Sequence, residues 1–69
     1  MVAVATTAEI TSAQERAIYD ELYNRGALTP AQVASLVGTH RGATAQWLTA
    51  KAAAHILEFD PRYGRYVIE

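Results

Sequence analysis

Gly38 and the two segments on either side of it place the strongest constraint on what this chain can fold into. Thr29-Pro30-Ala31-Gln32 has the residues of a capped helix start, with proline at a position whose N–H needs no partner. The helix that follows, about Pro30–Val37, stops at Gly38, and Ala34 lies four residues before that glycine. A small residue there lets the next helix cross closely, so the spacing predicts a helix-turn-helix whose second helix is presented outward.

Longer helices are expected on both sides of this short one. Ser12-Ala13-Gln14-Glu15 fits a capping box and predicts a helix to about Arg25, which ends at Gly26. The third helix is expected to run from His40 or Arg41 to Ala54. The positions expected to face inward from the second and third helices are Val33, Ala34, either Val37 or Leu36, Trp47, Leu48 and Ala52, with Thr44 and Ala45 near the rim.

The periodicity changes to that of strands after the third helix. Ile56–Phe59 and Arg65–Ile68 are rich in strand-forming residues, and Asp60–Gly64 between them is a turn with proline and glycine. We expect an antiparallel hairpin that packs Phe59 or Leu57 and Tyr66 or Ile68 beneath the third helix. The predicted fold class is α+β, mainly α: a winged helix-turn-helix of three helices and a two-stranded wing over residues 11–69, with residues 1–10 as a loosely ordered lead-in.

Composition narrows the function classes. The chain has 69 residues and no cysteine, which excludes disulfides and thiolate zinc sites. His40 and His55, without a carboxylate cluster, make a poor metal site. There is no glycine-rich phosphate loop and no activated nucleophile, so we expect neither an enzyme nor a cofactor site. No apolar run is long enough to span a membrane and Met1–Ala8 lacks the features of a signal peptide, so we expect a cytoplasmic protein.

The charge pattern leaves DNA binding open as one of two hypotheses. The net charge is −1, but most of the six basic residues lie in the C-terminal half of the chain. In this alternative the third helix enters the major groove and the wing touches phosphate or the minor groove, as a transcriptional regulator would. The candidate DNA contacts are Arg41, Thr44, Ala45, Lys51, Arg62 and Arg65.

The other hypothesis is a protein-assembly module. Leu28–Ile68 resembles the N-terminal winged-helix module of bacterial S-adenosylmethionine-dependent methyltransferases. The segments that carry the resemblance are Gln46-Trp47-Leu48, Ala52-Ala53-Ala54, Ile56-Leu57-Glu58-Phe59-Asp60-Pro61 and Gly64-Arg65-Tyr66. The chain departs from the family's usual pattern at Thr39, Thr44, Arg41-Gly42-Ala43 and at His55, where the family usually has glycine.

The resemblance implies dimer formation and cover for the active site of an attached methyltransferase domain, so the expected partner is a second copy, an adjacent domain, or both. From the residues themselves, the first helix carries an amphipathic surface that so small a monomer can hardly bury in full. The candidate interface residues are Ile18, Tyr19, Leu22 and Tyr23, wherever these are not core.

Overall fold

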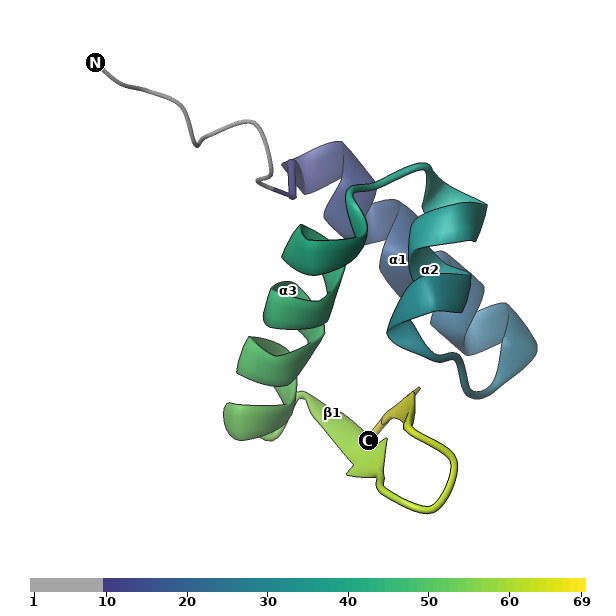
Figure 1. Ribbon diagram of the computed structural model, residues 1–69, viewed down its shortest axis with the longest axis vertical. Helices are drawn as coiled ribbons and strands as arrows, with labels where there is room; N and C mark the ends of the chain where they lie inside the picture. Colours follow the sequence, from purple (N-terminus) through teal and green to yellow (C-terminus); the bar gives the residue numbers. More distant parts are fainter. Residues whose placement is uncertain (1–9) are drawn as a thin grey trace.

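The computed structural model describes residues 10–69 and has the expected order of elements. Three helices, α1 (Ser12–Arg25), α2 (Pro30–Val37) and α3 (Arg41–Ala53), precede the strands β1 (Leu57–Asp60) and β2 (Arg65–Ile68). Figure 1 shows α1 and α2 together on one side, α3 on the other, and the hairpin across the end of the molecule opposite the start of α1. The mainly helical winged-helix layout is confirmed. The predicted lead-in lies outside the described residues except for Ile10, which packs against the core.

Capping boxes start α1 and α2, one of them a residue earlier than predicted. Thr11, not Ser12, is the N-cap of α1: its hydroxyl accepts the Gln14 N–H at 3.1 Å, and the Gln14 side chain accepts the Thr11 N–H at 2.9 Å. The extended backbone of Thr11 makes this exchange possible, so Ser12 becomes the first helical residue. Thr29 and Gln32 form the same exchange at the start of α2, as predicted.

The turn between α2 and α3 is tight and closed by hydrogen bonds. Gly38 has left-handed backbone angles, and its N–H donates to the Ala34 carbonyl at 2.8 Å. His40 then caps α3, since its Nδ1 accepts the Gly42 N–H at 3.1 Å. The helix-turn-helix predicted from Ala34 and Gly38 is therefore present.

The end of α3 determines where β1 begins. His55 is the only residue other than glycine with a positive φ, 63°, among residues 10–69. That conformation directs the Ile56 N–H back to the Lys51 carbonyl at 2.9 Å. Ile56 thus belongs to the helix terminus, and the strand predicted from Ile56 starts at Leu57 instead.

The wing is an antiparallel hairpin in which Leu57 pairs with Ile68 and Phe59 with Tyr66. Leu57 and Tyr66 are buried, while Phe59 and Ile68, on the same face, lie at the exposed margin. Asp60 is the last residue of β1, opposite Arg65, so the turn has four residues, not the predicted five. Its carboxylate accepts the Arg62 N–H at 3.0 Å, which stabilises the turn.

A backbone bridge from the α1–α2 connection to the wing was not predicted. Leu28, between α1 and α2, pairs antiparallel with Tyr66 through two backbone hydrogen bonds of 3.1 and 2.8 Å. This bridge joins the α1–α2 connection to β2 and attaches the wing to the helices. Leu28 lies between Ala27 and Thr29 with no alternating pattern around it, so the sequence did not predict this pairing.

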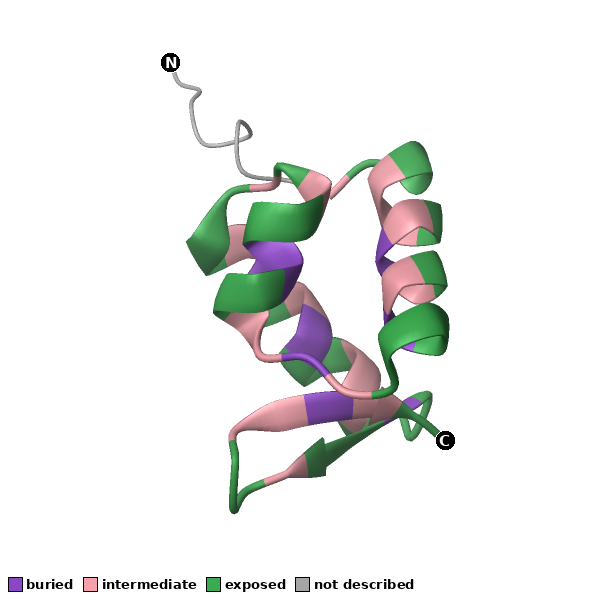
Figure 2. Cartoon of the chain, turned by 90° about the vertical axis from the view of Figure 1, so that its right-hand side faces the viewer, coloured by how far each residue is buried: buried purple, intermediate pink, exposed green. Residues whose placement is uncertain are grey.

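The core lies where the three helices meet the wing. Figure 2 shows buried parts of α1, α2 and α3 facing one another, with further buried positions on the wing below them. Val37 packs against this core while Leu36 is exposed, which resolves the alternative left open by the sequence. The buried apolar side chains are Ile18, Leu22, Leu28, Val33, Ala34, Leu48, Leu57 and Tyr66.

Candidate functional site

The face of α1 expected to form an interface divides into core and surface. Ile18 and Leu22 are 0% and 1% exposed and belong to the core, so they leave the set of candidate interface residues, which was limited to side chains outside the core. Their spacing of four residues places them on the one stripe of α1 that α2 and β2 cover. Tyr19 is half-buried, and Tyr23, one turn later, is 81% exposed.

Tyr19, Tyr23 and Trp47 form an aromatic surface across α1 and α3. The rings of Tyr19 and Trp47 meet edge to face with their centroids 5.4 Å apart. Trp47, expected in the core, is only half-buried because it fills the flank between the two helices and not their shared interior. Tyr23 extends this surface outward along α1.

Lys51 belongs to the edge of the aromatic surface. Its ammonium lies 5.3 Å from the centre of the Trp47 ring and 3.3 Å from a carboxylate oxygen of Glu15 on α1. The predicted role of Lys51 as a DNA contact would require it to leave both partners. In the structure it links α3 to α1.

A strip along the outside of α1 was missed by sequence reasoning. Ala13, Arg16, Asp20 and Tyr23 are all exposed and follow one another at intervals of three, four and three residues. Residues at these intervals form one stripe along a helix. The spacing was visible in the sequence, but only the burial of Ile18 and Leu22 shows that this stripe is the outer one. We call these four residues the outer strip.

Thr44 is not available to DNA. It is fully buried, and its hydroxyl donates to the His40 carbonyl at 2.8 Å while bonding the Thr39 hydroxyl. The prediction that Thr44 lies near the rim and touches a base is therefore wrong. Its place one turn before Leu48 points it into the interior, where the Thr39 hydroxyl and the His40 carbonyl satisfy its hydrogen bonds.

Beyond its first residue, the exposed surface of α3 is uncharged. Arg41 is exposed at the first residue of the helix, and Ala45 is half-buried. Beyond Arg41, no lysine or arginine is fully exposed on α3. The exposed residues of the rest of the helix are Gly42, Gln46, Thr49, Ala50 and Ala53.

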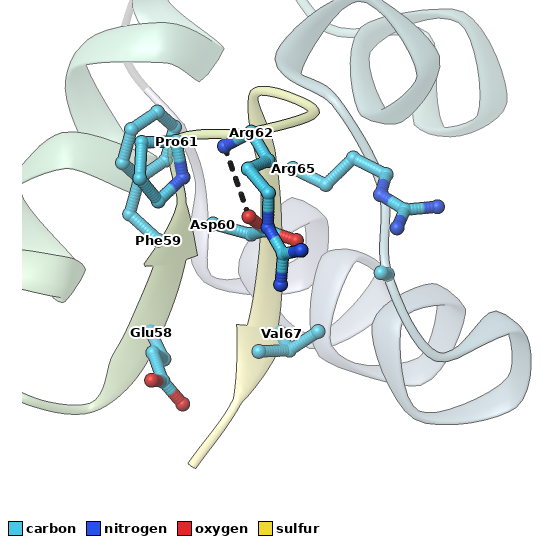
Figure 3. Close-up of a pocket in the computed structure, with 8 residues that line it drawn as sticks. Glu58, Phe59, Asp60, Pro61, Arg62, Arg65 and Val67 are labelled. Carbon is cyan, nitrogen blue, oxygen red and sulfur yellow. Dashed lines mark hydrogen bonds between the residues drawn. The ribbon is translucent and has the colours of Figure 1, made fainter.

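The outer side of the wing carries a shallow hollow of about 410 Å³ with charges of both signs. Figure 3 shows Arg62 alongside Asp60 in the middle of the hollow, Arg65 reaching to one side, and Glu58 farther along β1. The Arg65 guanidinium lies 4.5 Å from the centre of the Tyr63 ring, and its buried Nε has no hydrogen-bond partner among residues 10–69. Two acids and two bases together favour neither an anion nor a cation here.

Residues 10–69 contain no cluster of three or more histidine, aspartate or glutamate side chains placed to hold a metal ion. Within the same range, no helix is both long and apolar enough to cross a membrane.

Comparison of the chain with protein-family models, with curated proteins and with solved structures finds no match in any of the three.

Proposed function

We propose that this chain is a non-catalytic, cytoplasmic winged-helix module that assembles proteins through the exposed side of α1. The resemblance of its hairpin and of Gln46-Trp47-Leu48 to the N-terminal module of S-adenosylmethionine-dependent methyltransferases suggests the kind of partner. That partner is a second copy of the chain, an adjacent methyltransferase-type domain, or both.

The exposure of Tyr23 carries this proposal. Its side chain is 81% exposed, one helical turn after Tyr19, whose ring contacts Trp47, and these two aromatic residues are themselves only half-buried. Aromatic side chains that combine a large apolar area with a polar tip are enriched at protein interfaces. Burial of one such side chain contributes about 1.5–3 kcal/mol, so a few contacts of this kind support weak association.

The charge distribution supports DNA binding less well. Of the six candidate DNA contacts, Thr44 is buried, Ala45 and Arg65 are half-buried, and Lys51 is engaged by Glu15 and Trp47. Arg41 and Arg62 are the exposed cations that remain, at the start of α3 and in the turn of the wing. Because each neutralised phosphate adds to affinity, so few cations per chain favour only weak, nonspecific contact.

Sedimentation equilibrium tests the assembly function directly. We expect a dimer to form as the chain concentration approaches about 1 mM, and Tyr23→Glu to raise its Kd at least about tenfold because a charge replaces buried aromatic area. Tyr63→Glu is the matched control, since Tyr63 is also exposed (62%) but lies at the tip of the wing. A chain that stays monomeric at that concentration contradicts self-association.

A chemical-shift titration with mixed duplex DNA at two salt concentrations separates the two hypotheses. The assembly proposal predicts no saturable shifts on α3 or the wing. Saturable shifts at Gln46, Thr49 and Arg62 that weaken steeply with salt would favour the DNA-binding alternative.

A further inference from the structure

We propose that the partner is a second copy of this chain, bound through the outer strip of α1 with the two helices antiparallel. In this arrangement Arg16 of each copy lies opposite Asp20 of the other, and Tyr23 packs over Ala13. The inference rests on the proposed assembly function and adds to it the partner and the register.

The outer strip faces away from the rest of the domain. Ile18 and Leu22 mark the buried stripe of α1, while Ala13, Arg16, Asp20 and Tyr23 are exposed. Intervals of three and four residues are those at which two helices pack along a shared seam. α1 has 14 residues, or about 21 Å of helix, which is long enough to bring all four positions into one contact.

The strip is symmetric in a way that suits a two-fold axis. Arg16 and Asp20 lie two residues on either side of position 18, and Ala13 and Tyr23 lie five residues on either side of it. Two such helices can run antiparallel about a two-fold axis that passes at the level of position 18. Each residue then lies opposite the residue of the other copy that is equally far from position 18 on the other side. Arg16 then meets Asp20, and Tyr23 meets Ala13.

Each of these contacts between the two copies is chemically favourable. The opposite charges of Arg16 and Asp20 form two equivalent ion pairs, one on each side of the axis. The large Tyr23 ring lies over the small Ala13 side chain, which leaves room for the helices to approach. A parallel arrangement in register would instead place Arg16 against Arg16 and Asp20 against Asp20, so the same residues oppose it.

Within residues 10–69, neither charge of the outer strip takes part in an ion pair. The two ion pairs formed within residues 10–69 are Arg25 with Glu21 and Lys51 with Glu15. Neither pair uses Arg16 or Asp20, although these residues are four apart on one helix. The interface is a single helix pair, which is small for a specific complex, so the dimer should be weak.

Charge reversal tests the register. Arg16→Asp alone and Asp20→Arg alone each turn both intermolecular ion pairs into repulsive contacts, so each should raise the dimer Kd about tenfold in sedimentation equilibrium. Arg16→Asp combined with Asp20→Arg restores opposite charges across the axis and should return the Kd to within about threefold of the unaltered chain.

Arg25→Asp is the matched control. It makes the same change of net charge on the same helix and breaks the Arg25–Glu21 contact of 2.7 Å, but it lies outside the outer strip, so the Kd should not change. If the control weakens the dimer as much as Arg16→Asp does, or if the double variant stays as weak as the single ones, the register is wrong. If the unaltered chain dimerises and responds to Tyr23→Glu but not to charge reversal, the register fails while the assembly function stands. A strictly monomeric chain contradicts both.

Discussion

Single residues at the two ends of α3 depart from the usual choices at a helix terminus. His40 supplies the N-cap through its imidazole nitrogen, where serine, threonine, asparagine or aspartate is more common. An added Cβ on Gly42 would lie 3.3 Å from the His40 ring, so the ring sits close over the first turn. At the other end, His55 holds a left-handed conformation that usually belongs to glycine.

The left-handed His55 predicts a stabilising substitution. This conformation lowers the free energy of unfolding by about 1–2 kcal/mol for a residue that has a Cβ. Glycine avoids that cost, but its more flexible unfolded chain offsets part of the gain. We therefore expect His55→Gly to raise the free energy of unfolding by about 0.5–1 kcal/mol, which corresponds to a rise in Tm of about 2–8 °C.

Ala54→Gly is the control for this change. Ala54 precedes His55 and has an ordinary φ of −86°, so glycine there should lower the Tm. Thermal unfolding followed by circular dichroism measures both variants. An equal fall in both would show that His55 is not strained.

At the scale of elements, the wing combines a fixed base with an exposed tip. Its base is held by Leu57 and Tyr66 in the core and by the bridge between Leu28 and Tyr66. Its tip carries Tyr63, which is 62% exposed and lies against the Arg65 guanidinium, and Gly64, which has a φ of +65°. Contacts of the base therefore determine stability, while the side chains at the tip are available for surface contacts.

Substitutions in the turn should separate these two roles. Arg62→Ala combined with Tyr63→Ser removes only exposed contacts, including an Arg65–Tyr63 interaction of about 0.5–1 kcal/mol, so the Tm should fall by only a few degrees. Gly64→Val should cost about 1–3 kcal/mol through backbone strain alone, since no atom lies within 4 Å of an added Cβ.

Gly64→Asn is the control that isolates backbone strain. Asparagine also adds a side chain but tolerates a left-handed backbone, so it should lower the Tm less than valine does. Thermal unfolding compares the three proteins. A large loss from the tip double variant would instead mean that Tyr63 contributes to the core.

At the scale of the whole molecule, a small core makes stability and association interdependent. For a chain of 69 residues the free energy of unfolding is about 3–10 kcal/mol, so one large cavity removes much of it. A partner that binds only the folded chain adds to this stability in proportion to the logarithm of its concentration. The outer strip involves no core residue, so folding and association can be perturbed separately.

Leu48→Ala tests this link. Leu48 is fully buried, and its truncation should cost about 2–5 kcal/mol, which lowers the Tm strongly. A dimer with a Kd near about 1 mM adds only about 0.4 kcal/mol of stability at about 1 mM chain, so the helical circular dichroism signal of this variant, measured at its Tm, should rise modestly between about 10 μM and about 1 mM, and adding Tyr23→Glu should abolish the rise. A signal that does not depend on concentration would contradict the linkage.

Local signals in the sequence were sufficient to predict the order of elements. These signals are the Thr29–Gln32 pair, Gly38, and the proline and glycine of the turn. They act through backbone conformation and through hydrogen bonds within a few residues. The second helix, the second strand and the winged-helix layout therefore match the structure. The displaced boundaries at Thr11 and Leu57 differ by one residue because neighbouring residues competed for the same cap or terminus.

The sequence could not show which residues would meet across the fold. Three features depend on contacts between segments that are separate in the sequence. They are the burial of Thr44, the ion pair of Lys51 with Glu15, and the bridge from Leu28 to Tyr66. Ile18 and Leu22 looked as suited to an interface as Tyr19 and Tyr23, since every amphipathic helix presents an apolar stripe. Only the packing of α2 and β2 against α1 decided which stripe is covered, because burial depends on the atoms that surround a side chain and not on its own chemistry.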